Sequence, residues 1–177
     1  HRCVLCFFPE VIEKLCVQQG APVVGTLGSI MGKHPIYEHR KQGSSVCVLQ
    51  PGMGAPLAAA FLEELIALGC RKFIVCGVCG VLDSELELGK LLVPIRAVRD
   101  EGTSYHYIPP ARDIEACPQA IRAIEEALRE RGCFYQLVKT WTTDAFYRET
   151  PQKVALRRQE GCVVVEMEAA ALLAVSR

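Results

Sequence analysis

Short apolar runs alternate with helical hydrophobic patterns along the chain, which predicts alternating strands and helices. Residues 3–8 (CVLCFF) are apolar on both faces, as expected of a buried strand. Val11, Ile12 and Leu15 follow at helical spacing, with Pro9 in the first turn. The N-terminal part therefore reads as a strand that leads into a helix.

The same pattern continues over most of the chain. Strands are predicted at residues 45–50, 71–76, 90–98, 134–142 and 162–166, and helices at residues 57–68, 117–131, 151–160 and 168–177. Residues 20–45 are rich in glycine and are predicted to form loops with one short strand. The order strand, glycine turn, helix, strand over residues 45–76 indicates a parallel pair with a right-handed crossover.

These elements predict an α/β fold, a three-layer α/β/α sandwich around a mixed, largely parallel central sheet. The length fits a single domain over residues 1–177. The last predicted helix has no glycine, asparagine or proline to stop it, so we expect a further strand and helix beyond residue 177.

The charge balance narrows the class of ligand. Lys plus Arg and Asp plus Glu are 20 each, so no basic excess points to nucleic acid. We find neither a signal peptide nor an apolar run near the ~18 residues that a membrane span needs. We therefore expect a cytoplasmic protein whose partners are small molecules, without nucleic acid or membrane.

Ten cysteines raise the question of metal or redox chemistry. Most of them lie in apolar strand-like runs, where a cysteine behaves as a small hydrophobe. Cys76 and Cys79 form a CxxC motif, but it has no second ligand pair for zinc and follows a strand rather than starting a helix. Zinc and thioredoxin-type readings are therefore disfavoured, and we expect no metal and no cofactor.

The segment 163–173 (VVVEMEAAALL) carries the strongest chemical signal, because two carboxylates fall where a buried strand becomes a helix. If the strand continues through Met167, then the side chains of Glu166 and Glu168 point to the same face of the strand, and their carboxylates could accept hydrogen bonds from both hydroxyl groups of a diol in a fork. The alternative is that both glutamates only begin a solvated helix, where negative charge suits the N-terminal dipole.

Four other segments could serve a ligand, although each has an ordinary structural explanation. PGMGAP (residues 51–56) brings Gly52, Met53 and Gly54 before a helix N-terminus, where backbone amides can approach an anion, and residues 77–80 form a second glycine turn. His106 lies in the polar, aromatic segment 99–110, which could fold over a ligand or pack on the protein itself. Phe146 or Tyr147 could stack on a base, or could equally be a surface aromatic.

Taken together, these segments resemble the nucleoside phosphorylase family, and within it the uridine phosphorylase-like branch. The resemblance runs through PGMGAP, FIVCGVCGVL, RDEGTSYHYIPP, TTDAFY and VVVEMEAAALL in that order. It implies that Glu168 holds the ribose hydroxyls as the catalytic residue, that Met167 packs on the sugar, and that Phe146 stacks near the base. Further residues expected around the substrate are Glu166, Cys79, Gly80 and His106, with Gly52, Met53 and Gly54 on the phosphate side.

The resemblance also implies a reaction and an assembly. The family reaction is reversible phosphorolysis of an N-glycosidic bond, here of a uridine-like nucleoside, which gives free base and ribose 1-phosphate. Phosphate would be a co-substrate. Family members assemble from dimers, so we expect a homo-oligomer, with a hexamer as one form.

The chain departs from the family where positive charge should surround phosphate. Val11 and Val75 stand at expected arginine positions, Val78 replaces a threonine, and Arg40 is only a weak substitute for a third arginine. Thr150 and Gln152 stand where base-reading residues are expected. Two alternatives therefore stay open: a nucleosidase that uses water, with Glu10 as its base, and a nucleoside-binding relative without turnover.

Overall fold

The computed structural model of the chain describes residues 1–30, 32–41 and 43–177. Contacts divide the chain into two compact units, one of residues 1–53 and 60–78 and the other of residues 54–59 and 79–177. Each unit contains one five-stranded sheet. The α/β class with mixed strand pairing is confirmed, although the strands form two sheets where the sequence predicted one central sheet.

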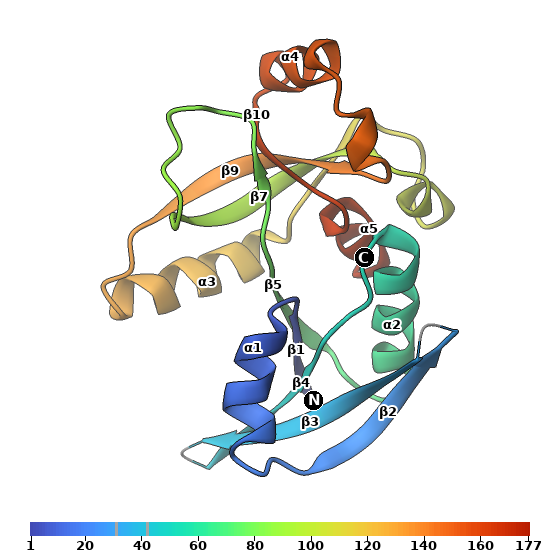
Figure 1. The fold of residues 1–177 in the computed structure, drawn as a ribbon, viewed down its shortest axis with the longest axis vertical. Coiled ribbons are helices and arrows are strands. Elements are labelled where there is room, and N and C mark those ends of the chain that lie inside the picture. The colour runs from blue at the N-terminus through green and yellow to red at the C-terminus, as the bar shows by residue number, and fades with distance from the viewer. Residues whose placement is uncertain (31, 42) are drawn as a thin grey trace. The chain divides into compact units, whose positions relative to one another are not determined.

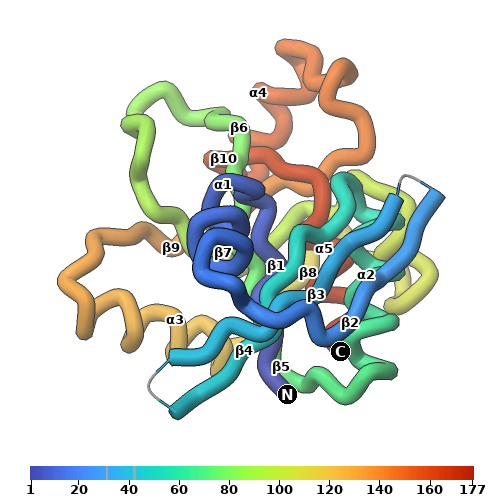
Figure 2. Tube along the Cα trace, turned by 60° about the horizontal axis from the view of Figure 1, so that its bottom comes forward, coloured from blue at the N-terminus to red at the C-terminus, as the bar shows by residue number. Residues whose placement is uncertain are grey.

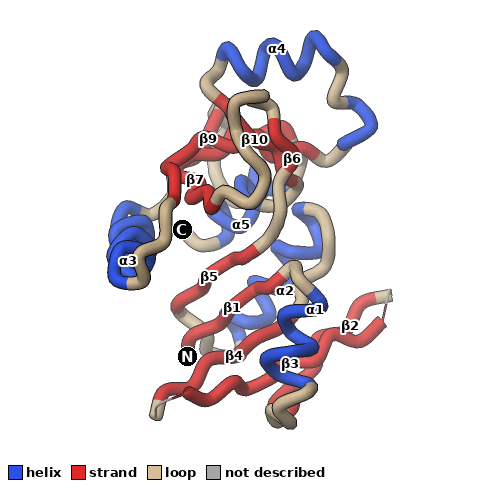
Figure 3. The backbone as a smooth tube through the Cα atoms, turned by 60° about the vertical axis from the view of Figure 1, so that its left-hand side comes forward, coloured by secondary structure: helices blue, strands red, loops and turns tan. Residues whose placement is uncertain are grey.

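The first unit is built on a mixed sheet in the order β2-β3-β4-β1-β5. Its strands are β1 (Arg2–Cys6), β2 (Val23–Ser29), β3 (Gly32–Lys41), β4 (Ser44–Leu49) and β5 (Lys72–Cys76), which Figure 3 shows side by side. The strands β4 and β5 are parallel, as predicted, but they are not neighbours, because β1 lies between them and pairs with both.

The prediction of loops over residues 20–45 is wrong. This part forms the long antiparallel pair β2 and β3, which are labelled side by side in Figures 1 and 2. The glycines that suggested loops lie in paired strands. A Cβ on Gly25 would come within 3.3 Å of Ile36 Cδ1, so glycine at this position allows the Ile36 side chain to pack closely on the strand. The range includes residues 31 and 42, which lie outside the described part.

A short helical segment packs on this first sheet. The helix α1 (Pro9–Ile12) begins with Pro9 and continues into a π-helical turn, η1 (Glu13–Val17). Ile12 and Cys16 are buried against Cys6 of β1, which accounts for the helical spacing seen in the sequence. The longer helix α2 (Ala55–Ala67) has residues in both units.

The second unit is built on a mixed sheet in the order β6-β10-β9-β7-β8. Its strands are β6 (Gly80–Val81), β7 (Leu91–Asp100), β8 (Asp113–Glu115), β9 (Tyr135–Thr143) and β10 (Cys162–Glu166). The long strands β7, β9 and β10 were predicted and run parallel to one another. The short strands β6 and β8 were not predicted, since two or three residues leave no period to read.

Helices cover both faces of the second sheet. Successive residues of a strand face opposite sides, and Ala97 packs with Ala170 and Ala174 of α5 (Ala169–Val175), while Val98 belongs to the cluster that touches Val154 of α4 (Pro151–Gln159). Figure 1 shows α4 and α5 on either side of the ribbon of β7 and β9. This unit therefore has the three-layer arrangement that the sequence predicted.

Helix ends follow the sequence signals closely. Thr150 caps α4 by accepting a hydrogen bond from Lys153 N, and Pro151 is the first residue of that helix. The helix α3 (Pro118–Glu130) likewise starts with proline, and Gly132 follows it with φ +63°. None of the helices in the described part of the chain is long and apolar enough to cross a membrane.

Candidate active site

The two glutamates of the strand-to-helix junction have different surroundings, and they do not form the fork that the sequence suggested. The strand β10 ends at Glu166, and residues 167 and 168 bend away before α5 begins. The condition for a common face, a strand that continues through Met167, is therefore not met.

Glu168 contacts the glycine turn that comes before α2. Its Oε1 atom accepts a hydrogen bond of 2.6 Å from Gly54 N, and its Oε2 atom lies 3.3 Å from Met167 N. Gly54 has φ +89°, a conformation that glycine adopts without strain. Two segments that the sequence singled out separately, VVVEMEAAALL and the end of PGMGAP, thus meet at Glu168.

The Glu168 carboxylate is half-buried and can still accept hydrogen bonds. A carboxylate offers about four acceptor positions, and the described residues supply two donors to this one. Burial raises the pKa of Glu168, while the N–H groups of Gly54 and Met167 act in the opposite direction. The acceptor positions that remain suit this side chain to bind neighbouring hydroxyl groups.

Glu166 makes more contacts than Glu168. Its two oxygens accept hydrogen bonds from Thr140 Oγ1, Thr142 Oγ1, Glu168 N and Ala169 N, at 3.2, 2.6, 2.7 and 2.6 Å. Burial raises the pKa of Glu166, the hydrogen bonds from Thr142, Ala169 N and Glu168 N oppose the shift, and the negative charge of Glu168 adds to it. The direct substrate contact predicted for Glu166 stays a prediction.

Cys79 and Gly80 lie beside the same strand end. Gly80 pairs with Val165 in the antiparallel β6–β10 ladder, and a Cβ on Gly80 would come within 2.9 Å of Val165 Cγ1. Partial burial raises the pKa of the Cys79 thiol, and the charge of Glu166 raises it further. A redox or nucleophilic cysteine needs a lowered pKa, so this environment disfavours the thioredoxin-type reading.

Phe146 lies in a short 3-10 turn, η3 (Phe146–Arg148), between β9 and α4. Its ring is 46% exposed and lies against the ring of Tyr147, with centroids 4.3 Å apart. Tyr147 is 89% exposed. An exposed ring at the end of a buried strand is available to stack on a planar ligand, and base stacking by Phe146 remains a prediction.

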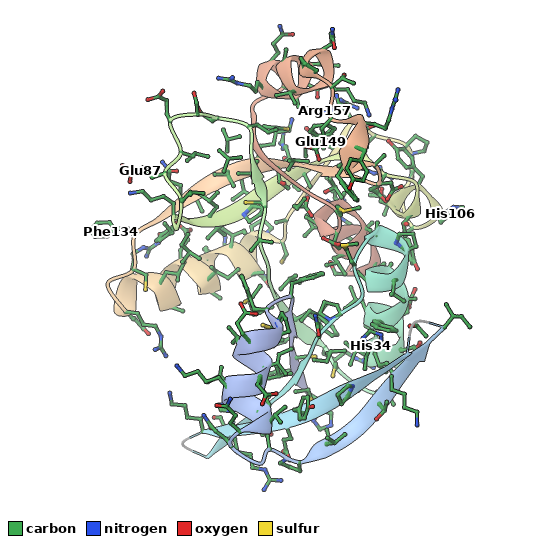
Figure 4. The ribbon with its side chains drawn as sticks, in the orientation of Figure 1. His34, Glu87, His106, Phe134, Glu149 and Arg157 are labelled. Carbon is green, nitrogen blue, oxygen red and sulfur yellow. The ribbon has the colours of Figure 1, made fainter. Side chains whose placement is uncertain are left out.

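His106 is exposed at the end of another 3-10 turn, η2 (Thr103–His106), as Figure 4 shows. The loop that carries His106 is fixed by a buried arginine, Arg99. Arg99 is 1% exposed, donates to Ser104 Oγ and to the carbonyl oxygen of Pro109, and lies 4.1 Å from the Tyr105 ring centroid. Tyr105 thus packs on its own unit, while the ligand role of His106 stays a prediction.

The residues expected on the phosphate side divide between the units. Gly54 belongs to the second unit, whereas Gly52, which is buried, and Met53, which is 72% exposed, end the first stretch of the first unit. Val11 and Val75, at the expected arginine positions, are 38% and 45% exposed. Arg40 is paired with Glu38 at 2.7 Å.

Sequence reasoning missed a polar cluster behind these loops. Asp100 Oδ2 at the end of β7 accepts hydrogen bonds from Trp141 Nε1, Lys153 Nζ and Arg157 Nη2, at 3.0, 3.1 and 2.9 Å. Arg157, labelled in Figure 4, is 4% exposed. Its place within the Arg157–Arg158 pair of a polar helix gave no sign of burial.

A metal group or a hollow among the described residues would be a further candidate site. Among the described residues, no three His, Cys, Asp or Glu side chains are grouped so that they could hold a metal ion. A hollow lined by Leu86, Leu137 and Val163 lies elsewhere in the second unit and contains none of the candidate residues.

The chain is similar in sequence to proteins that are named phosphorylases. The family model described as the phosphorylase superfamily matches residues 1–177. A guanosine phosphorylase of Halorubrum lacusprofundi is 32% identical over 139 residues, which are 76% of this chain and 56% of that protein. A uridine phosphorylase of Salmonella typhimurium is 30% identical over 139 residues, 78% of this chain and 54% of the relative. The chain thus spans about half the length of the curated relatives it matches.

Two solved structures have similar folds. A uridine phosphorylase from Vibrio fischeri matches with a TM-score of 0.84 and 26% identity, over 99% of this chain and 73% of the other. An AMP nucleosidase from Bacteroides thetaiotaomicron matches with a TM-score of 0.84 and 28% identity, over 99% of this chain and 74% of the other. The likeness therefore includes proteins named for phosphorolysis and one named for hydrolysis.

Proposed function

Because the chain belongs to the phosphorylase superfamily, we propose that it is a pentosyltransferase that cleaves a nucleoside with phosphate. The C1′–N bond of the nucleoside breaks, its electron pair leaves with the base, and a phosphate oxygen forms the new bond to C1′. The products are free base and ribose 1-phosphate. The names of the relatives support uridine or guanosine as the class of substrate.

The observation that carries the proposal is the contact between Glu168 and Gly54. The Gly54 N–H orients one carboxylate oxygen at 2.6 Å and leaves acceptor capacity on Glu168. An ionised carboxylate in this state can accept from both hydroxyls of a ribose, and charge-assisted bonds of this kind are roughly twice as strong as neutral ones. Glu168 would therefore hold the sugar while positive charge develops at C1′.

The neighbouring residues fit supporting roles in this proposal. Met167 would pack on the sugar, and the exposed ring of Phe146 would stack on the base. Gly54 offers a backbone without a side chain beside the ribose, and Gly52 and Met53 belong to the same turn. Phosphate would be a co-substrate, and the protein would act without a further cofactor, as a homo-oligomer in the cytoplasm.

A second candidate, hydrolysis, rests on the missing cations. Val11 and Val75 are partly exposed and uncharged where arginines are expected, and Arg40 is engaged by Glu38. Each lost charged hydrogen bond would cost about 1.5–3 kcal/mol of phosphate binding. Water as the nucleophile needs no such charge, and one similar structure is named an AMP nucleosidase. The exposed Glu10 in α1 would then act as the base.

The test measures release of free base from uridine, guanosine, adenosine and AMP, each with and without phosphate, by the protein at its full natural length. Release that requires phosphate is expected, with uridine or guanosine as the better substrate. Release that is equal without phosphate would establish the hydrolase instead.

Variants at position 168 connect the activity to the site. Glu168→Ala removes the charged contacts to the sugar and should lower kcat/KM by about 100-fold or more. Glu126→Ala, an exposed glutamate on α3, is the matched control and should leave kcat/KM unchanged. A folded protein that binds nucleosides by calorimetry but releases no base would be the binding relative, and one that does neither would refute the proposal.

A further inference from the structure

The four hydrogen bonds to Glu166 come from two different elements. Thr140 and Thr142 lie on β9, two residues apart and both fully buried, so they face the same side of the sheet. The N–H groups of Glu168 and Ala169 belong to the start of α5. Glu166 at the end of β10 therefore ties a neighbouring strand to the turn that carries Glu168.

All four partners act as donors toward Glu166. The two backbone N–H groups can only donate. Thr142 Oγ1 accepts a hydrogen bond of 3.0 Å from Ala170 N, which leaves its hydroxyl proton for Glu166 Oε1 at 2.6 Å. Among the described residues, the other hydrogen-bond partner of Thr140 Oγ1 is Val164 O, at a longer 3.5 Å.

This arrangement uses the acceptor capacity of Glu166 completely. Two carboxylate oxygens offer about four lone-pair positions, and four donors occupy them. A ribose hydroxyl could bind Glu166 only by displacing one of these groups, two of which are backbone N–H groups of the turn itself. Glu168 differs, since the described residues give its carboxylate two donors.

We propose that Glu166 and Thr142 form a positioning pair that fixes the backbone carrying Glu168, and that Glu166 does not bind the ribose itself. The inference rests on the proposed function, because it assigns the pair a role through the residue proposed to hold the sugar. A bond of 2.7 Å from Glu168 N to Glu166 fixes the peptide that directs the Glu168 side chain. Placement of reacting groups to within about 1 Å decides rates of this kind.

The negative charge of Glu168 acts in turn on Glu166. It raises the pKa of Glu166 in addition to the effect of burial. Cys79 is the other titratable group, among the described residues, that interacts electrostatically with Glu166.

The first experiment is a double-mutant cycle on base release with Glu166→Gln and Glu168→Ala. Glu166→Gln should lower kcat/KM by about five- to tenfold, as charge-assisted bonds become neutral. In the Glu168→Ala background, Glu166→Gln should change kcat/KM by less than about twofold, since it acts through Glu168.

A second experiment does not depend on catalysis. Thr142→Val should release the Ala170 amide and loosen Glu166, so hydrogen exchange at Ala169 and Ala170 should accelerate by about tenfold or more. Thr140→Val is the control variant. It makes the same change on the same buried face and removes the longer hydrogen bond of 3.2 Å to Glu166, but it keeps the bond from Ala170 N to Thr142, so exchange at these amides should accelerate clearly less than in Thr142→Val.

The outcomes separate this inference from the proposed function. A Glu166→Gln loss that persists in the Glu168→Ala background would overturn the positioning role and indicate direct contact or a purely structural effect. Equal exchange in Thr142→Val and Thr140→Val would also overturn it. If the unchanged protein releases no base, the proposed function fails, and the exchange comparison still decides whether the pair fixes the turn.

Discussion

Asp100 is a residue at which three elements of the second unit meet. It ends β7 and accepts hydrogen bonds from Trp141 on β9 and from Lys153 and Arg157 on α4. Arg157 also donates to Glu160 and lies 5.2 Å from the Trp141 ring centroid. Burial opposes the ionisation of Asp100, but the hydrogen bonds from Arg157 and Lys153 outweigh it and lower the pKa of this carboxyl.

Replacement of Asp100 by asparagine should destabilise the protein by about 2–3 kcal/mol at neutral pH. Breaking a buried pair costs about 3–5 kcal/mol, and the Asp100 side chain is one quarter exposed, which reduces the loss. The measurement is the free energy of unfolding in urea. Asp83→Asn is the control. The Asp83 carboxylate accepts a hydrogen bond from Glu85 N in a turn, and this substitution should lower the free energy of unfolding by less than about 1 kcal/mol.

The same variant gives a pH dependence with a defined sign. A lowered pKa in the folded state means that the stability contributed by Asp100 is present above its unfolded pKa and is lost as pH falls through its folded pKa. The gap in stability between the natural protein and Asp100→Asn should therefore shrink below the usual range of aspartate. A gap that stays constant into that acid range would contradict the assignment.

The contact between β6 and β10 depends on the absence of a side chain at Gly80. This strand is only two residues long, and its pairing brings the Gly80 backbone against Val165. A Cβ there would lie 2.9 Å from Val165 Cγ1, closer than side-chain atoms tolerate. The glycine in the second predicted turn therefore has a packing reason that is independent of any ligand.

Gly80→Ala should destabilise the fold by about 1–3 kcal/mol, the usual cost of overpacking. Gly28→Ala is the matched control: it also lies in a strand, and nothing lies within 4 Å of its added Cβ. The midpoint of urea unfolding compares the two variants. Partial recovery on adding Val165→Ala to Gly80→Ala is expected, and two equally stable single variants would refute the close approach.

The sequence predicted those elements whose signals are local. Proline at the first turn and glycine past the last one mark α3 and α4, and the apolar runs mark β1, β4, β5, β7, β9 and β10. It failed where pairing with a distant partner decides the structure. The pair β2–β3 contains glycines that read as loop, and β8 is strand only because Ile114 pairs with Ala97 of β7.

The candidate site was likewise predictable only where a single segment of the sequence carries the signal. The motif order led to Glu168 and to the glycine turn, and their contact across 114 residues follows from neither segment alone. The sequence predicted a strand that ends at Glu166 and left open whether it continues through Met167, on which a common face for Glu166 and Glu168 depended. The strand does end at Glu166, and the four internal groups that donate to this carboxylate could not be read from the spacing.

The whole chain has ten free cysteines distributed over both units. Their environments differ widely. Burial, with the neighbouring thiols Cys70 and Cys47, raises the pKa of Cys3 to about 12, and burial raises the pKa of Cys162 to about 11. Cys117 is exposed, and hydrogen bonds from the N–H groups of Ala120 and Gln119 lower the pKa of its thiol.

Alkylation should therefore proceed in an order set by the fold. With iodoacetamide at neutral pH, Cys117 should react in the native protein, whereas Cys3 and Cys162 should react only after unfolding. Peptide mass spectrometry of samples taken over time, with and without urea, measures the order. Labelling of Cys3 as fast as that of Cys117 under native conditions would contradict the burial described for the first unit.

Trp141 is the sole tryptophan of the chain, and it is fully buried in the second unit, where its Nε1 atom donates to Asp100. Intrinsic fluorescence excited at the red edge of protein absorption thus comes from one indole in a known setting. The first unit contributes nothing at that wavelength. A change in this emission therefore reports that water has reached the second unit. Unfolding that is confined to the first unit leaves the emission unchanged.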